Sequence, residues 1–144
     1  MARYVNRYVN RYIMIVAILG LMPCGAVQAR SVSSLPAGSY STVIVVEGTP
    51  QPVTLELRDT TPGGRRNHLI YSRPRNCKMS IEYSGSLNNE HVFYVTGAIP
   101  SAGKWCRDLK KNGATVSVRA VDERTFRYDI LSGRQIIESA EVVR

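Results

Sequence analysis

Residue types that carry catalytic or metal chemistry are scarce in this chain. Its 144 residues include two histidines and three cysteines. The sequence has no nucleophile-elbow motif, no phosphate-cradling glycine loop and no HExxH pair. His68 and His91 also lack ligand-like spacing to the cysteines. We therefore expect a protein that is not an enzyme and that holds no metal and no cofactor.

Acidic residues are few compared with basic ones. The chain has 11 Asp and Glu against 19 Lys and Arg, which gives a net charge of +8. Three of the basic residues and none of the acidic ones lie in residues 1–29, so residues 30–144 carry +5. Because an excess of this size is too small to indicate a nucleic-acid binder, we expect no nucleic-acid partner.

The main apolar stretch, Ile13–Met22, has about half of the roughly 20 residues that a membrane-spanning helix needs. It follows a basic segment without acidic residues and precedes the small residues of Ala26–Ala29. This order predicts a cleaved secretory signal over residues 1–29. An uncleaved anchor and a lipoprotein modified at Cys24 are the alternatives. We expect residues 30–144 to form a single exported β-domain, periplasmic or secreted, whose membrane contact is at most peripheral.

Two cysteines remain once the signal is removed, and they predict a disulfide. Cys77 and Cys106 would face an oxidising compartment, where two thiols in a small domain most simply pair. By the chain-entropy relation, closing this loop contributes roughly 3–4 kcal/mol. Such a bond would be a sizeable share of the stability of a domain of this size.

Runs of β-branched and aromatic residues, separated by Gly, Pro and Asn clusters, dominate residues 30–144. These runs predict an all-β fold of seven to eight strands, either a small antiparallel barrel or a two-layer sandwich. Only a helical turn is expected, near Arg107–Lys110. The expected strands are Tyr40–Val46, Val53–Leu57, His68–Ser72, Cys77–Tyr83, Glu90–Thr96, Ala114–Val121, Thr125–Leu131 and Gln135–Val143.

Period-two alternation indicates which side chains face inward. Val116, Val118, Phe126 and Tyr128 fall on inward faces, where they fill a core or line a small-ligand cavity. His91 shares a face with Phe93, so we expect a rim or partly packed residue rather than a catalyst.

Basic residues and the single tryptophan gather around the predicted disulfide. Pairing of the two cysteines would bring Arg73, Arg75, Lys104, Trp105 and Arg107 together, and we call this set the disulfide rim. Cationic loops beside an aromatic side chain suit an anionic surface, either an acidic protein or an anionic envelope component. These five residues are the predicted partner-binding residues.

A strand with a cysteine, a hairpin, a loop with a second cysteine and a final meander form an outline that resembles calycin-type barrels and periplasmic lysozyme inhibitors. No motif matches those families residue by residue, so no functional residues are carried over. The leading hypothesis is an exported, non-enzymatic binding domain that contacts another envelope or extracellular macromolecule as an inhibitor, immunity factor or adaptor. A small-ligand barrel and a structural component of a surface assembly are the alternatives, and the oligomeric state stays open.

Overall fold

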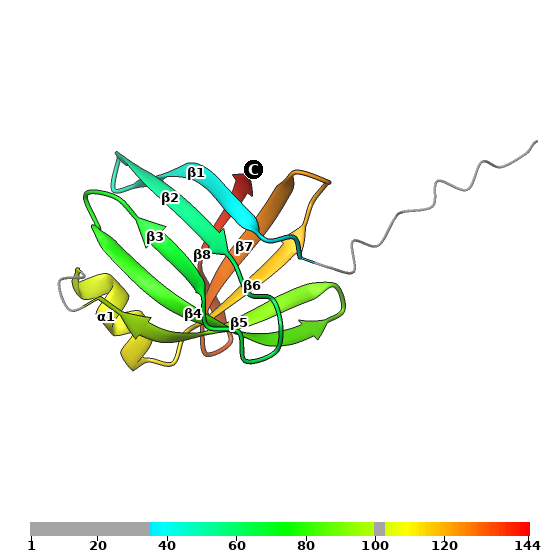
Figure 1. Cartoon of the computed structure of the whole chain (residues 1–144). Coiled ribbons are helices and arrows are strands. Elements are labelled where there is room, and N and C mark those ends of the chain that lie inside the picture. The colour runs from blue at the N-terminus through cyan, green and yellow to red at the C-terminus, as the bar shows by residue number, and fades with distance from the viewer. Residues whose placement is uncertain (1–34, 100–102) are drawn as a thin grey trace, which may run out of the picture.

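The computed structural model of this protein describes residues 35–99 and 103–144. The expected signal segment, residues 1–29, lies outside the described residues. Eight antiparallel strands pair in chain order and close into a barrel (Figure 1). The prediction of an all-β fold is therefore confirmed, and the architecture is the barrel rather than the sandwich.

The strands and the helix follow one another along the chain with short connections. Their bounds are β1 Gly38–Val46, β2 Thr49–Leu57, β3 Asn67–Tyr71, β4 Cys77–Leu87, β5 Glu90–Ala98, α1 Lys104–Lys111, β6 Thr115–Ala120, β7 Thr125–Ser132 and β8 Gln135–Val143.

The barrel interior is built from the inward faces that the alternation predicted. On β4, Cys77, Met79, Ile81 and Tyr83 are buried, and the residues between them are partly exposed. Every second residue of an antiparallel strand points to the same face, so one apolar row per strand is enough to fill the interior. The rings of Tyr40 and Phe126 pack edge to face with centroids 4.9 Å apart, which joins the first strand to the seventh.

β2 is longer than the sequence predicts. The segment Thr49–Pro52 was expected in a loop because of its two prolines, yet it pairs with β1. Pro50 lies opposite Val45 and Pro52 lies opposite Val43. Proline is tolerated in a strand where its nitrogen is not needed as a ladder donor. The hairpin connection between β1 and β2 is correspondingly short.

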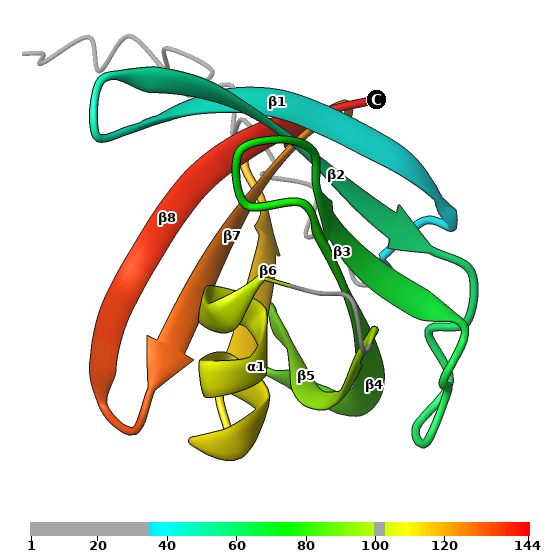
Figure 2. The ribbon, with the colours of Figure 1, turned by 90° about the vertical axis from the view of Figure 1, so that its left-hand side faces the viewer.

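α1 is a helix of eight residues, longer than the predicted helical turn. Lys, Arg and Leu favour helix and none of its residues is β-branched, so propensity supports the extra turn. Cys106 and Leu109, three positions apart, form its buried side. Figure 2 shows α1 seated at the end of the barrel that faces the viewer. No helix in residues 35–99 and 103–144 has the length and apolar character to cross a membrane.

The barrel closes through a narrow seam between its first and last strands. Among the described residues, β1 and β8 pair at one position, Ser41 with Val143. Figure 2 shows the two strands running apart from there. By contrast, β1 pairs with β2 along its whole length. Backbone pairing therefore closes this side of the barrel at one end only.

Candidate functional site

The predicted disulfide between Cys77 and Cys106 is present and anchors the candidate site. Cys77 begins β4 and Cys106 lies in α1, and both side chains are buried. Their Cα atoms are 6.2 Å apart, within the range that a disulfide spans. The bond fixes α1 to the barrel, so the side chains of the helix have defined positions relative to β4.

Arg75 and Trp105, two of the predicted rim residues, are in contact. The Arg75 guanidinium carbon lies 3.7 Å from the centroid of the Trp105 ring and 5.2 Å from that of Tyr71. The two rings pack edge to face with centroids 4.9 Å apart. A cation over an aromatic face is attracted by the ring quadrupole, more strongly where water is excluded. These contacts join α1 to the turn between β3 and β4.

Glu138 completes the cluster from β8, although the sequence analysis did not select it. Its carboxylate forms an ion pair with Arg75, whose side chain is 15% exposed against 9% for Glu138. Tyr71 also donates its hydroxyl to Glu138, and Tyr128 donates at 2.9 Å. Removing charges from water is costly unless their hydrogen-bonding groups find partners, and this carboxylate has three. The ion pair thus joins β8 to the rim where backbone pairing with β1 has stopped.

The two tyrosines that contact Glu138 are held in their protonated form. Burial is the main cause that raises the pKa of the Tyr71 and Tyr128 hydroxyls. The negative charge of Glu138 raises the pKa of both further. Both hydroxyls therefore remain donors to the carboxylate over the physiological pH range.

Gln51 of β2 positions the turn that carries Arg73 and Arg75. Its Nε2 donates to the carbonyl oxygen of Ser72 at 2.8 Å, and its Oε1 accepts from the backbone N–H of Arg75 at 3.0 Å. Gln51 is fully buried, so both bonds form away from bulk water. These two hydrogen bonds hold the turn where strand pairing has ended, and they fix the position of the Arg75 backbone.

The other three rim residues present their charges at the surface. Arg73, Lys104 and Arg107 are exposed. Lys104 forms an ion pair with Asp108 at 3.1 Å, an exposed contact of small energetic value. α1 carries four basic residues and Asp108 as its acidic residue. The rim therefore combines a fixed Arg75–Trp105 frame with exposed cations on two elements.

A second basic cluster in the sequence is neutralised by its neighbours. Arg65 forms an ion pair with Glu82 at 2.8 Å, and Arg66 lies 4.0 Å from the Asp59 carboxylate. Asn67 holds this loop in place, since its Oδ1 accepts from the backbone N–H of Asp59 at 2.9 Å. This cluster matches two cations with two carboxylates, whereas the rim sets four cations against Glu138 and Asp108, so the rim is the stronger candidate for an anionic partner.

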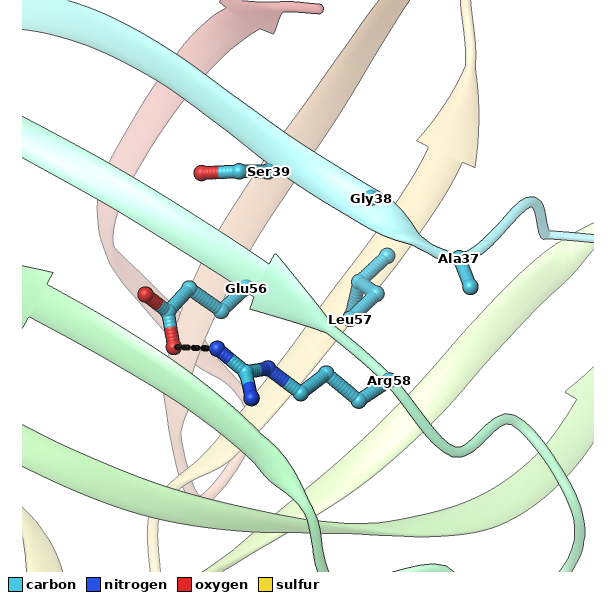
Figure 3. Close-up of a pocket in the computed structure, with 6 residues that line it drawn as sticks. All are labelled: Ala37, Gly38, Ser39, Glu56, Leu57 and Arg58. Atoms are coloured by element: carbon cyan, nitrogen blue, oxygen red, sulfur yellow. Dashed lines mark ion pairs between the residues drawn. The ribbon is translucent and has the colours of Figure 1, made fainter.

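The interior residues that were considered for a ligand cavity are packed. Val116, Val118, Phe126 and Tyr128 are at most 2% exposed. A surface depression of about 440 Å³ lies at the start of β1 and the end of β2, and none of those four side chains lines it (Figure 3). Its lining residues are Ala37, Gly38, Ser39, Glu56, Leu57 and Arg58. The Arg58–Glu56 ion pair of 3.8 Å spans its polar side.

Both histidines lie away from the rim residues. His91 is 5% exposed and its Nδ1 lies 3.0 Å from the Tyr83 hydroxyl. His68 lies on β3, with its Nδ1 3.7 Å from a Glu56 oxygen. Burial lowers the pKa of each imidazole below its ordinary value. No group of His, Cys, Asp and Glu among the described residues is arranged to hold a metal ion.

We expect the free energy of unfolding to fall as the pH drops below about 6.5, because the unfolded chain then binds protons at His68 and His91 more readily than the folded chain does. The loss continues until the folded-state pKa values are passed. Urea unfolding at about pH 7.5 and pH 5 measures it, and the double variant His68→Gln and His91→Gln should flatten the dependence. An equally steep dependence in that variant would show that other groups cause it.

Comparison with protein-family models, curated proteins and solved structures found no significant match. The functional argument therefore rests on the geometry of the disulfide rim.

Proposed function

We propose that this protein is an exported, non-enzymatic binding domain that docks an acidic surface of another envelope or extracellular macromolecule through the disulfide rim. The observation that carries the proposal is a fixed cationic surface. Arg73 on the β3–β4 turn and Lys104 and Arg107 on α1 are exposed, and they belong to the two elements that the Arg75–Trp105 contact joins. The disulfide and Glu138 hold both elements on the barrel.

Pre-organisation is the physical reason why this surface suits binding. Ordering a loop during association costs free energy, and a turn and helix that are already fixed avoid that cost. Tryptophan and arginine are also enriched among the residues that dominate interface energies. Arg73, Arg75, Lys104 and Arg107 supply four positive charges and their ion-pair partners Glu138 and Asp108 supply two negative ones, so this surface carries a net charge of +2. Such charges steer an acidic partner and repel a basic one.

Charge reversal at the rim tests the proposal. We expect the triple variant Arg73→Glu, Lys104→Glu and Arg107→Glu to capture at least about tenfold less of its partner, since roughly 1.4 kcal/mol of lost attraction accounts for a factor of ten. The measurement is affinity capture from the native envelope or medium, quantified by mass spectrometry for proteins that co-purify with the unmodified protein.

A matched variant separates the rim from the net charge. Reversal of Arg65, Arg119 and Arg134 changes the total charge by the same amount on exposed residues outside the rim. We expect it to capture the partner normally, and both variants to unfold at nearly the same urea concentration. Equal losses in the two variants, or no loss at the rim variant, would refute the proposed surface.

A further inference from the structure

One edge of β1 lacks a strand partner among the described residues. From Thr42 to Val46, β1 pairs with β2 on one side, while its pairing with β8 on the other side is confined to Ser41. Figure 2 shows β8 leading away from this part of β1. An edge of this kind is a template for another extended strand, because a further strand satisfies its row of backbone groups.

The prolines of β2 show which backbone groups face the open edge. Val43 lies opposite Pro52, and the backbone N–H of Ser72 donates to the Pro52 carbonyl at 3.0 Å, so the Pro52 backbone faces β3. In an antiparallel ladder, residues opposite each other both point toward the shared ladder or both away from it. Val43 thus points its N–H and C=O away from β2, and Val45, two residues on, does the same.

The side chains on this edge carry none of the usual protection against strand addition. Val43 is 60% exposed and Val45 is 71% exposed. The segment Thr42–Val46 reads TVIVV, with no charge, proline or glycine. Proteins commonly protect an exposed edge with lysine, proline, a bulge or a covering loop. An uncharged, β-branched edge without lysine, proline or a bulge favours pairing with another strand.

We propose that this edge binds β1 of a second copy of the chain, antiparallel, about a two-fold axis at Ile44. The axis places Val43 of each copy opposite Val45 of the other, and all four valines point their backbone groups into the new ladder. Each Val43–Val45 pair exchanges two N–H···O=C bonds, which gives four across the interface. The same patch thus serves on both copies, as closed two-fold dimers require.

The side-chain order of the edge argues for a second copy as the occupant. The segment Thr42–Val46 contributes no charge. Because its sequence is nearly palindromic about Ile44, a two-fold axis there sets apolar side chains of one copy opposite apolar side chains of the other. The inference does not depend on the proposed function, because the edge shares no residue with the disulfide rim.

The oligomeric state of the purified protein tests the inference. Light scattering after size exclusion, together with native mass spectrometry, should show a dimer that dissociates on dilution. The variant Val43→Lys and Val45→Lys should be monomeric with an intact barrel. The control variant Leu87→Lys and Val121→Lys adds the same charge at two apolar residues that are 71% and 52% exposed. It should remain dimeric. At about 1 mM protein, even a dimer with a Kd near 1 mM would be well populated. A protein that is still monomeric at that concentration would overturn the inference.

A proline variant tests the hydrogen-bond register directly. Val45→Pro removes an N–H that faces the open edge and leaves the β2 ladder complete, so the monomer should fold. It removes two of the four intermolecular bonds, and we expect the dimer to weaken by at least about tenfold, or roughly 1.4 kcal/mol. An unchanged dimer constant would contradict the register. Protection of the Val43 and Val45 amides from hydrogen exchange in a monomer would place another segment of the same chain there and overturn the proposal.

Discussion

Replacing Glu138 with alanine is expected to lower the free energy of unfolding by about 3–5 kcal/mol, the usual cost of removing one member of a buried ion pair. The cost is large because three donors lose their acceptor together. Arg75 keeps a charge on a largely buried side chain, and the hydroxyls of Tyr71 and Tyr128 lose their partner inside the barrel. Urea unfolding followed by circular dichroism measures the difference.

Two further variants identify the cause of that loss. Glu138→Gln keeps the shape and an acceptor oxygen for the tyrosines but removes the charge that Arg75 needs, so its stability should lie between those of the wild type and the alanine variant. Glu141→Ala removes an exposed carboxylate from the same strand and should change stability by no more than about 0.5 kcal/mol. A Glu138→Ala loss as small as the Glu141→Ala loss would mean that the ion pair does not hold β8 to the rim.

Reduction of the Cys77–Cys106 bond is expected to cost about 3–4 kcal/mol of stability, from the loop entropy released in the unfolded chain. The two residues are separated by 29 positions, and every other atom of the protein is unchanged by reduction. The bond also holds α1, so reduction should expose Trp105 further and shift its emission to longer wavelength. Trp105 is the only tryptophan in the chain, so this signal reports on the rim alone.

The double variant Cys77→Ala and Cys106→Ala provides the comparison for reduction. It should match the reduced protein in unfolding midpoint and in Trp105 emission, and a reducing agent should have no further effect on it. An oxidised protein no more stable than the reduced one would show that the bond stabilises nothing. Unchanged Trp105 emission after reduction would show that the Arg75 and Tyr71 contacts hold α1 without it.

Most of the fold could be predicted because strand periodicity is a local property. The alternation identified Val116 and Val118 on β6 and Phe126 and Tyr128 on β7 as inward-facing, and removal of the predicted signal left one cysteine pair. α1 was underestimated although its composition favours helix, because most of the stability of a short helix comes from packing of its buried side, here Cys106 and Leu109, and that packing is not local. The extra length of β2 was missed because proline usually ends a strand, and only the pairing shows that Pro52 faces β3.

The electrostatics of the candidate site could be predicted only in part. Arg75 and Trp105 were selected from their place beside the cysteines, and the structure brings them into contact. Their link to Glu138 could not be found, because 63 residues separate Arg75 from Glu138 and a pairing irregularity between Ile130 and Leu131 alters the register of β8. The register in which the first and last strands of a barrel meet depends on all its strands together. The narrow pairing between β1 and β8 therefore could not be predicted from the sequence either.

Emission from Trp105 during titration with an acidic polymer is the most direct test of the disulfide rim as a docking surface. Polyglutamate is a defined probe, and its binding can be followed independently by light scattering. We predict a saturable change in Trp105 emission that weakens at high salt, persists in the Arg65, Arg119 and Arg134 reversal and disappears in the Arg73, Lys104 and Arg107 reversal. Binding of polyglutamate with unchanged Trp105 emission, or an equal response from both reversal variants, would contradict the account.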